Sequence, residues 1–321
     1  MNDIVFRKDF KEAGATIEIA PREIASRYRV STRDLALSVA ASESLPESLQ
    51  RLRLEEPAAK FDEWNKHQWT AAIQYFVSSL NRDYADRGAN YREVHDDILS
   101  KYAADGEMPV SQVPVGTPIV LGVPKPSSLS VEKTLLERRT TLVPSSALLT
   151  LDEMAAILYR SMARIRAFRT LKIESRPELA MTNFGPALDV YLLVFDVEGL
   201  ERGIYAYDIR NHTLTMKEGK LDRKESRSII VGQPATETAA VTLIYIADVE
   251  RHQWRYRHHR ALRGMWIDTA KAVNELLWEL SSRSIVPHIT PALSDTRVME
   301  ILGLPTDMSM QAAYAVSFSG E

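Results

Sequence analysis

The residues best suited to chemistry stand together in one segment, from His252 to Leu276. Trp254, Arg255 and Tyr256 are followed there by further cations and by the start of an amphipathic helical pattern. A cation beside a tyrosine stabilises tyrosinate and lowers the pKa of the phenol, which is ordinarily about 10. Arg255 itself stays protonated and cannot act as a base. The segment therefore predicts a proton-handling site with Tyr256 as the candidate base, and the alternative is an ordinary packed tyrosine.

The same segment is strongly basic, since it gathers Arg251, Arg255, Arg257, Arg260 and Arg263. Three interpretations stay open: a solvated basic surface, a site for a cofactor phosphate or an acidic peptide, and a nucleic-acid contact. Guanidinium groups bind phosphate and carboxylate through two parallel hydrogen bonds, which suits the anion site. Nothing else in the chain supports a nucleic-acid contact. The formal net charge of the chain is -3, so the molecule as a whole is not built to bind nucleic acid. We expect no nucleic-acid partner.

Composition excludes several classes of site. The chain has 321 residues, enough for two domains, and no cysteine. Disulfides, thiolate nucleophiles, cysteine-ligated zinc and iron–sulfur clusters are therefore excluded. Neighbouring His258 and His259 could not both face one metal ion from a strand, so we expect no metal site. No apolar run reaches the roughly 20 residues that span a bilayer, and the N-terminal segment carries charges where a signal peptide is apolar. We expect a cytoplasmic protein without a membrane partner.

The patterns of apolar residues predict an α+β fold with a mixed sheet and a mostly helical N-terminal domain. Residues 1–108 form that domain, with helices over 61–80 and 91–104. Prolines interrupt residues 109–126, which we interpret as a linker that Ile119, Val120 and Leu121 could order against a surface. Residues 127–321 alternate helices and strands. Helices are predicted over 130–139, 151–168, 268–280 and 298–302, and strands over 189–197, 203–208, 211–216, 240–247 and 312–318.

No P-loop, GxGxxG, GxSxG or HExxH motif is present. Several weaker pieces follow one another in a fixed order, namely Glu137-Arg-Arg-Thr140, the hairpin Glu198-Gly-Leu-Glu-Arg-Gly-Ile-Tyr-Ala-Tyr-Asp208, Gln253-Trp-Arg-Tyr256 and Leu302-Gly-Leu304. In order and spacing they resemble the nitroreductase-like superfamily. Their nearest resemblance is to its SagB-type dehydrogenases, the FMN-dependent azoline oxidases of ribosomal peptide biosynthesis. The hairpin is the most specific match.

The resemblance implies a nitroreductase-like FMN-binding sandwich over residues 127–321, with the flavin site between two protomers that dimerise through long helices. Tyr256 and Arg255 stand where azoline oxidases have Tyr and Lys, and would be the catalytic pair. Residues at the matching positions would bind FMN, with the first three at its phosphate: Arg138, Arg139, Thr140, Asn183, Asn274 and Thr290. The expected partners are a modified peptide substrate and either a second copy or another subunit of a biosynthetic complex.

This chain departs from the family pattern at three places besides Arg255, which replaces the catalytic lysine. The family's loop before its strand is rich in Ser, Ala and Gly, and here it reads AMTNFGPA. Leu142 replaces a basic residue, and Pro291 stands in the turn that offers a backbone N–H to the flavin N5, although proline has no N–H. The expected function is an FMN-dependent dehydrogenase or oxidase that modifies a ribosomally made peptide, such as azoline to azole. The alternatives are a small-molecule nitroreductase-type flavoenzyme and a flavin-free partner or scaffold subunit.

Overall fold

A computed structural model describes residues 4–9, 16–21, 28–31, 69, 72, 75, 79, 91–106, 114–125, 130–170 and 187–321. Contacts divide the chain into two compact units, Met1–Arg87 and Gly88–Glu321. Helix α5 (Tyr91–Asp105) has the predicted extent but belongs to the second unit, whereas the sequence analysis placed it in the N-terminal domain. The candidate flavin contact Asn183 and most of the helix predicted over 61–80 lie outside the described residues.

The described backbone of the first unit includes a three-stranded antiparallel sheet, in the order β1 (Ile4–Asp9), β2 (Thr16–Pro21) and β3 (Tyr28–Ser31). The expectation of a mostly helical N-terminal part did not anticipate these strands. The alternation of Ile17 and Ile19 with polar neighbours has the period of two that suits a strand, and it is too short to stand out beside helical periodicity.

The second unit is built on a seven-stranded sheet in the order β11-β12-β10-β6-β8-β9-β4. Its strands are β4 (Ile119–Val120), β6 (Leu188–Val194), β8 (Gly203–Asp208), β9 (Thr213–Glu218), β10 (Val241–Asp248), β11 (His288–Thr290) and β12 (Met310–Phe318). Every neighbouring pair is antiparallel, so the expected mixed sheet is wrong. Periodicity identifies strands but not their directions. A parallel pair occurs separately, between β5 (Leu149–Thr150) and β7 (Val197–Glu198).

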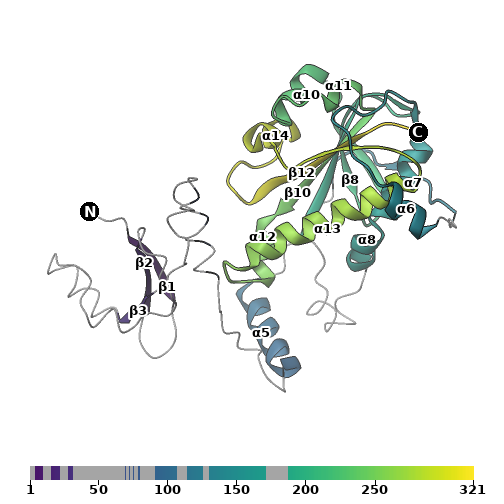
Figure 1. Cartoon of the computed structure of the whole chain (residues 1–321). Coiled ribbons are helices and arrows are strands. Elements are labelled where there is room, and N and C mark those ends of the chain that lie inside the picture. Colours follow the sequence, from purple (N-terminus) through teal and green to yellow (C-terminus); the bar gives the residue numbers. More distant parts are fainter. Residues whose placement is uncertain are drawn as a thin grey trace. The chain divides into compact units, whose positions relative to one another are not determined.

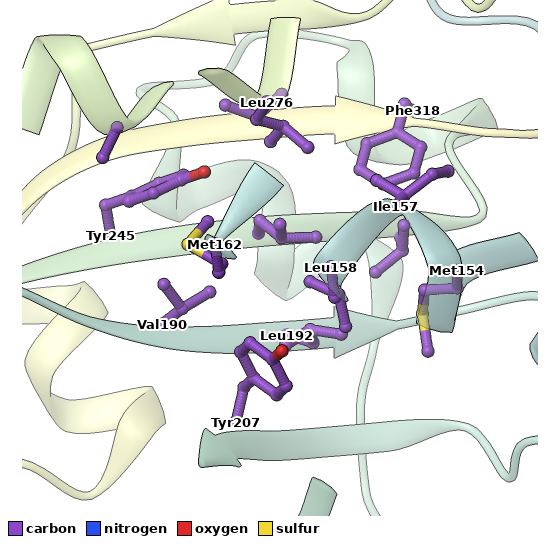
Figure 2. Close-up of a cluster of buried hydrophobic side chains, with 14 of the residues drawn as sticks. Met154, Ile157, Leu158, Met162, Val190, Leu192, Tyr207, Tyr245, Leu276 and Phe318 are labelled. Carbon is purple, nitrogen blue, oxygen red and sulfur yellow. The ribbon is translucent and has the colours of Figure 1, made fainter. Parts of the chain in front are cut away.

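Strand β10 lies inside the sheet between β12 and β6, and all of its residues are buried. Because side chains alternate along a strand, Leu243 and Tyr245 enter one apolar cluster, while Ile244 and Ile246 enter another on the opposite face. Figure 2 shows the first cluster, to which Tyr245 and the helix residue Leu276 both belong. Helices cover both faces (Figure 1): α7 (Leu151–Ser161), α8 (Ala163–Thr170) and α13 (Ala261–Ser281) on the first, and α10 (Arg223–Ile229), α11 (Ala235–Thr238) and α14 (Asp295–Leu302) on the second.

Local signals placed several helix ends correctly. Thr150 and Glu153 form the predicted capping box at the start of α7, and Ser130 caps α6 (Val131–Glu137). Gly303 ends α14 in the left-handed conformation, with a φ of 60°. The helix predicted over 151–168 is divided at Met162 into α7 and α8. The long helix α13 begins at Ala261, earlier than the predicted Asp268.

Part of the predicted linker is ordered against the sheet. Ile119 and Val120 pair with Leu214 and Thr213 as the edge strand β4. The backbone N–H of buried Leu121 donates to the carbonyl of His212 over 3.2 Å. The apolar residues inside the proline-rich stretch therefore extend the sheet. Within the described part of the chain, no helix is both long enough and apolar enough to cross a membrane.

Candidate functional site

The candidate catalytic segment follows strand β10 directly. Helix α12 (Val249–Arg255) begins at the end of β10, where the Asp248 carboxylate accepts the Arg251 backbone N–H over 2.9 Å. The buried Arg251 guanidinium lies 3.4 Å from the Asp189 carboxylate and 3.6 Å from that of Asp248. Arg169 of α8 pairs with the same Asp189 oxygen over 3.0 Å. This buried charge cluster holds α12 against the end of the sheet.

Tyr256 ends α12, and its backbone N–H donates to the His252 carbonyl over 3.0 Å. The rings of Tyr256 and His252 are 4.9 Å apart between centroids. The buried His252 ring also contacts the carbonyl of Ala261 through Nε2 over 2.9 Å, which joins α12 to the start of α13. The Arg255 guanidinium is buried and lies 5.3 Å from the Tyr256 ring centroid. The two predicted catalytic residues therefore lie together, with the tyrosine half-buried.

The electrostatic environment of Tyr256 differs from the expectation. Burial raises the pKa of the Tyr256 phenol above its ordinary value, Arg255 opposes this rise, and Asp268 adds to it. Arg257, which was expected to lower the pKa as well, pairs instead with Asp105 of α5. The predicted lowering of the Tyr256 pKa is therefore wrong for a single copy of the chain. In this environment most of the Tyr256 phenol keeps its proton at neutral pH.

The candidate phosphate residues lie in an exposed loop. Arg138 is the C-terminal cap of α6, and Arg139 and Thr140 follow it. The next residue fixes the loop to strand β11, since the Thr141 N–H donates to the Pro287 carbonyl over 2.9 Å. The Thr141 carbonyl also accepts from His288 Nδ1 over 2.8 Å. Two guanidinium groups and a hydroxyl are thus presented to solvent on an anchored loop, an arrangement that can bind a phosphate.

Thr290 is buried in β11 and is occupied by protein contacts. Its Oγ1 accepts from Gln233 Nε2 and from the Ala292 backbone N–H, both over 3.0 Å. The Gln233 side chain in turn contacts His288 Nε2 over 2.6 Å. Because Pro291 has no N–H and that of Ala292 is engaged, neither residue can donate to a flavin here. The Arg138 loop therefore suits the phosphate of FMN, whereas the turn at Pro291 and Ala292 does not suit the flavin ring.

The two halves of the predicted site lie at opposite ends of α13, which has 21 residues and is therefore roughly 30 Å long. His252, beside Tyr256, contacts Ala261 at the start of the helix. At its other end, the Ser281 hydroxyl donates to the α6 carbonyl of Thr134 over 2.8 Å. Figure 1 shows α12 and α6 at these two ends. A single chain therefore does not bring Tyr256 to the Arg138 loop, and half-buried Asn274 lies on the helix between them.

A cavity of about 560 Å³ opens between α6, the α7–α8 junction and α13, and it contains none of the predicted site residues. Ion pairs between Arg160 and Glu279 (3.1 Å) and between Arg164 and Glu275 (2.9 Å) cross it. Its lining residues are Val131, Thr134, Leu135, Arg160, Ala163, Arg164, Glu275, Trp278, Glu279 and Ser282. Across the described ranges, no three His, Asp or Glu side chains gather as metal ligands.

Comparisons with solved structures identify the fold. A protein of Anabaena variabilis assigned as a nitroreductase superposes with a TM-score of 0.52 and 19% identity, over 70% of this chain and 47% of that one. This chain has a nitroreductase-like fold. It spans about half the length of the Anabaena protein. A chain of the Escherichia coli microcin synthetase McbBCD complex, bound to truncated pro-MccB17, superposes with a TM-score of 0.43 and 16% identity. The match covers 72% of this chain and 94% of that chain.

A curated relative matches nearly the whole chain. The trifolitoxin operon protein TfxC of Rhizobium leguminosarum bv. trifolii is 22% identical over 311 residues, which cover 89% of this chain and 87% of that protein. No family model matches the sequence.

Proposed function

We propose that this protein is a SagB-type, FMN-dependent oxidoreductase that dehydrogenates a modified, ribosomally made peptide. The observation that carries the proposal is the exposed loop of Arg138, Arg139 and Thr140, anchored to β11 through Thr141 in a nitroreductase-like fold. The match of the hairpin to the SagB-type pattern supports the subfamily. The relationship to a protein named for the trifolitoxin operon supports a role in making a natural product. Azoline to azole oxidation is the reaction we propose.

The residues of the chain have separate roles in this proposal. Arg138, Arg139 and Thr140 bind the FMN phosphate, because cations and a hydroxyl satisfy its oxygens. When bound, FMN supplies the acceptor for a hydride from the substrate. Tyr256 accepts the proton that leaves the substrate through its minor tyrosinate form, and buried Arg255 stabilises the charge on the phenol oxygen. Asn183 and Asn274 remain candidate flavin contacts. Thr290 would contribute by holding the shape of its turn, since its hydroxyl is bound to Gln233 and Ala292.

The separation of Tyr256 from the Arg138 loop requires a second copy in this proposal. Helix α13 exposes Trp266, Ile267 and Trp278, which are 40%, 54% and 45% accessible. Ile267 and Trp278 are eleven residues apart, about three helical turns, so they lie on one face. Apolar residues gathered on one exposed face are typical of an interface. We propose a homodimer through α13, in which each site combines residues of both copies.

The second candidate function is that of a flavin-free subunit of a peptide-modifying complex. The turn at Pro291 favours it, because neither Pro291 nor Ala292 can donate an N–H to a flavin. In such a subunit the Arg138 loop would bind an anionic segment of a partner instead of FMN. The absorbance of the purified protein distinguishes the two candidates, since only the first copurifies with or takes up FMN.

The direct test is to purify the protein, measure flavin absorbance, add FMN and assay a synthetic thiazoline-containing peptide in air. The first proposal expects one FMN per chain, loss of two hydrogens from the peptide and formation of one hydrogen peroxide per thiazole. The Arg138→Ala variant serves as the matched control for cofactor loading. Protein that stays colourless at saturating FMN, while binding a protein partner, would support the second candidate.

A further inference from the structure

The last turn of α5 contacts the Trp254–Arg257 segment, although about 150 residues separate them in the chain. The Trp254 indole N–H donates to the Gly106 carbonyl over 3.1 Å. Arg257 pairs with the Asp105 carboxylate, and its guanidinium lies 3.9 Å from the centroid of the Tyr102 ring. The rings of Tyr102 and Trp254 meet edge to face, with centroids 6.2 Å apart. Figure 1 shows α5 ending at α12.

These contacts supply what the C-terminus of α5 lacks. The last carbonyls of a helix have no partner within it, and its C-terminal end favours a cation. The final turn of α5 has no basic residue of its own and carries Asp105, which is unfavourable there. Arg257 provides the missing positive charge, and Trp254 provides a donor for the Gly106 carbonyl. Gly106 itself has a φ of 153°, which L side chains rarely adopt.

The positions of the contacts bear directly on Tyr256. Trp254 and Arg257 are three residues apart, and they turn to α5 on either side of Arg255 and Tyr256. The Arg257 Nε also donates to the Trp254 carbonyl over 3.3 Å, which closes the turn. The backbone of Tyr256 is thereby held from both sides, so that a displaced α5 would move the phenol.

We propose that the last turn of α5 is a clamp that positions Tyr256. Asp105 and Tyr102 are positioning residues, which act through Arg257 and Trp254 and do not touch the substrate. The catalytic part of this inference rests on the proposed function. Its structural part, that α5 orders the Tyr256 turn, stands on the contacts alone.

The test compares full-length Asp105→Lys, Asp105→Glu and Asp97→Lys proteins. A lysine in place of Asp105 would repel Arg257, whereas a glutamate there keeps the negative charge. Asp97 pairs with Lys101 on exposed α5 away from the clamp, so its replacement is the control. Hydrogen exchange of the peptide covering residues 252–260 is the readout that needs neither flavin nor substrate. Turnover of the thiazoline peptide gives kcat and KM where the protein is active.

The clamp predicts faster exchange over 252–260 in Asp105→Lys alone, with about a tenfold lower kcat and an unchanged KM and FMN affinity. The expected loss lies above the roughly fivefold that an exposed ion pair allows and below the ~10²-fold that a displacement of 1 Å can cost. Asp105→Glu should show wild-type exchange over residues 252–260 and wild-type kcat. Unchanged exchange in Asp105→Lys overturns the clamp, as does changed exchange with wild-type kcat. If the wild-type protein has no turnover, the proposed function fails, and exchange alone decides whether the clamp exists.

Discussion

The Asp189 carboxylate of β6 lies 3.0 Å from the Arg169 guanidinium of α8, and both side chains are largely buried. Desolvation lowers the pKa of Arg169, and the attraction to Asp189 opposes that effect. Arg251 reaches the same carboxylate from α12 over 3.4 Å. Asp189 is therefore shared by two buried cations from two different helices, and Asp248 is a second carboxylate partner of Arg251. This cluster joins the sheet to the segment that carries Tyr256.

Replacing Asp189 with Asn should therefore destabilise the second unit strongly. The change leaves the buried Arg169 guanidinium facing a neutral amide and weakens the pairing of Arg251, which keeps Asp248. Removing one partner of a buried ion pair costs about 3–5 kcal/mol. The unfolding midpoint in urea, followed by circular dichroism, measures the loss. Asp97→Asn is the control, since its pair with Lys101 is exposed and such pairs contribute about 0–1 kcal/mol. Equal midpoints for the two variants would contradict a stabilising role for the Asp189 cluster.

The sequence predicted most of the second unit because its signals are local. The capping box at Thr150, the hairpin between β8 and β9 and the glycine at 303 each fix a structure within a few residues. The three strands of the first unit and the antiparallel directions of the sheet were missed. Strand direction depends on distant pairings, and the alternating runs of the first unit are too short for their period to identify strands.

The sequence predicted which residues belong to the candidate site, but it did not predict their contacts with distant parts of the chain. Tyr256 and Arg255 do lie together, because neighbours in sequence stay neighbours in space. The pairing of Arg257 with Asp105 was missed, since the sequence around either residue does not indicate a partner about 150 positions away. Burial of Tyr256 was missed for the same reason, and burial decides the direction of its pKa shift. An acidic residue in the last turn of a helix, as at Asp105, is the one signal that could have indicated an external cation.

The pH dependence of turnover tests the role of Tyr256. Burial raises its pKa above about 10, so only a small fraction is tyrosinate at neutral pH. A base must be deprotonated, and kcat/KM should therefore increase about tenfold per pH unit from about pH 7 to about pH 10. A proton donor must be protonated, which predicts a flat profile over this range and a decline above it. A plateau near pH 7 would show that another group titrates.

Removing the Tyr256 hydroxyl tests its chemistry directly. Tyr256→Phe should lower kcat by about 10²–10⁴-fold, the usual contribution of general acid–base catalysis, while FMN stays bound. The loss belongs in kcat, because the proton moves only in the chemical step. Arg255→Lys restores the pair found in azoline oxidases and should keep or raise activity. Full activity in Tyr256→Phe would make the Trp-Arg-Tyr sequence a structural feature.

Flavin titration tests the exposed loop after α6. Arg138→Ala should weaken FMN binding by about 1.5–3 kcal/mol, the usual contribution of a hydrogen bond to a charged group. Quenching of flavin fluorescence measures the affinity. Lys133→Ala is the matched control, because it removes an exposed cation of the same helix that pairs with Glu137. If both variants bind as tightly as the wild type, the phosphate lies elsewhere, and the arginines after Trp254 become the next candidates.

The exposed face of α13 should decide whether a site forms at all. Ile267→Glu places a charge on the proposed dimer interface and should convert a dimer into a monomer, as measured by light scattering. FMN binding should be lost with the dimer, although Ile267 lies far along the chain from Arg138, because the proposed flavin site lies between the two copies. Val120→Glu is the control, since Val120 is 78% exposed on the edge strand β4, on an element other than α13. A monomeric variant that still binds FMN with wild-type affinity would show that one chain is sufficient to bind the cofactor, and the shared site would have to be abandoned.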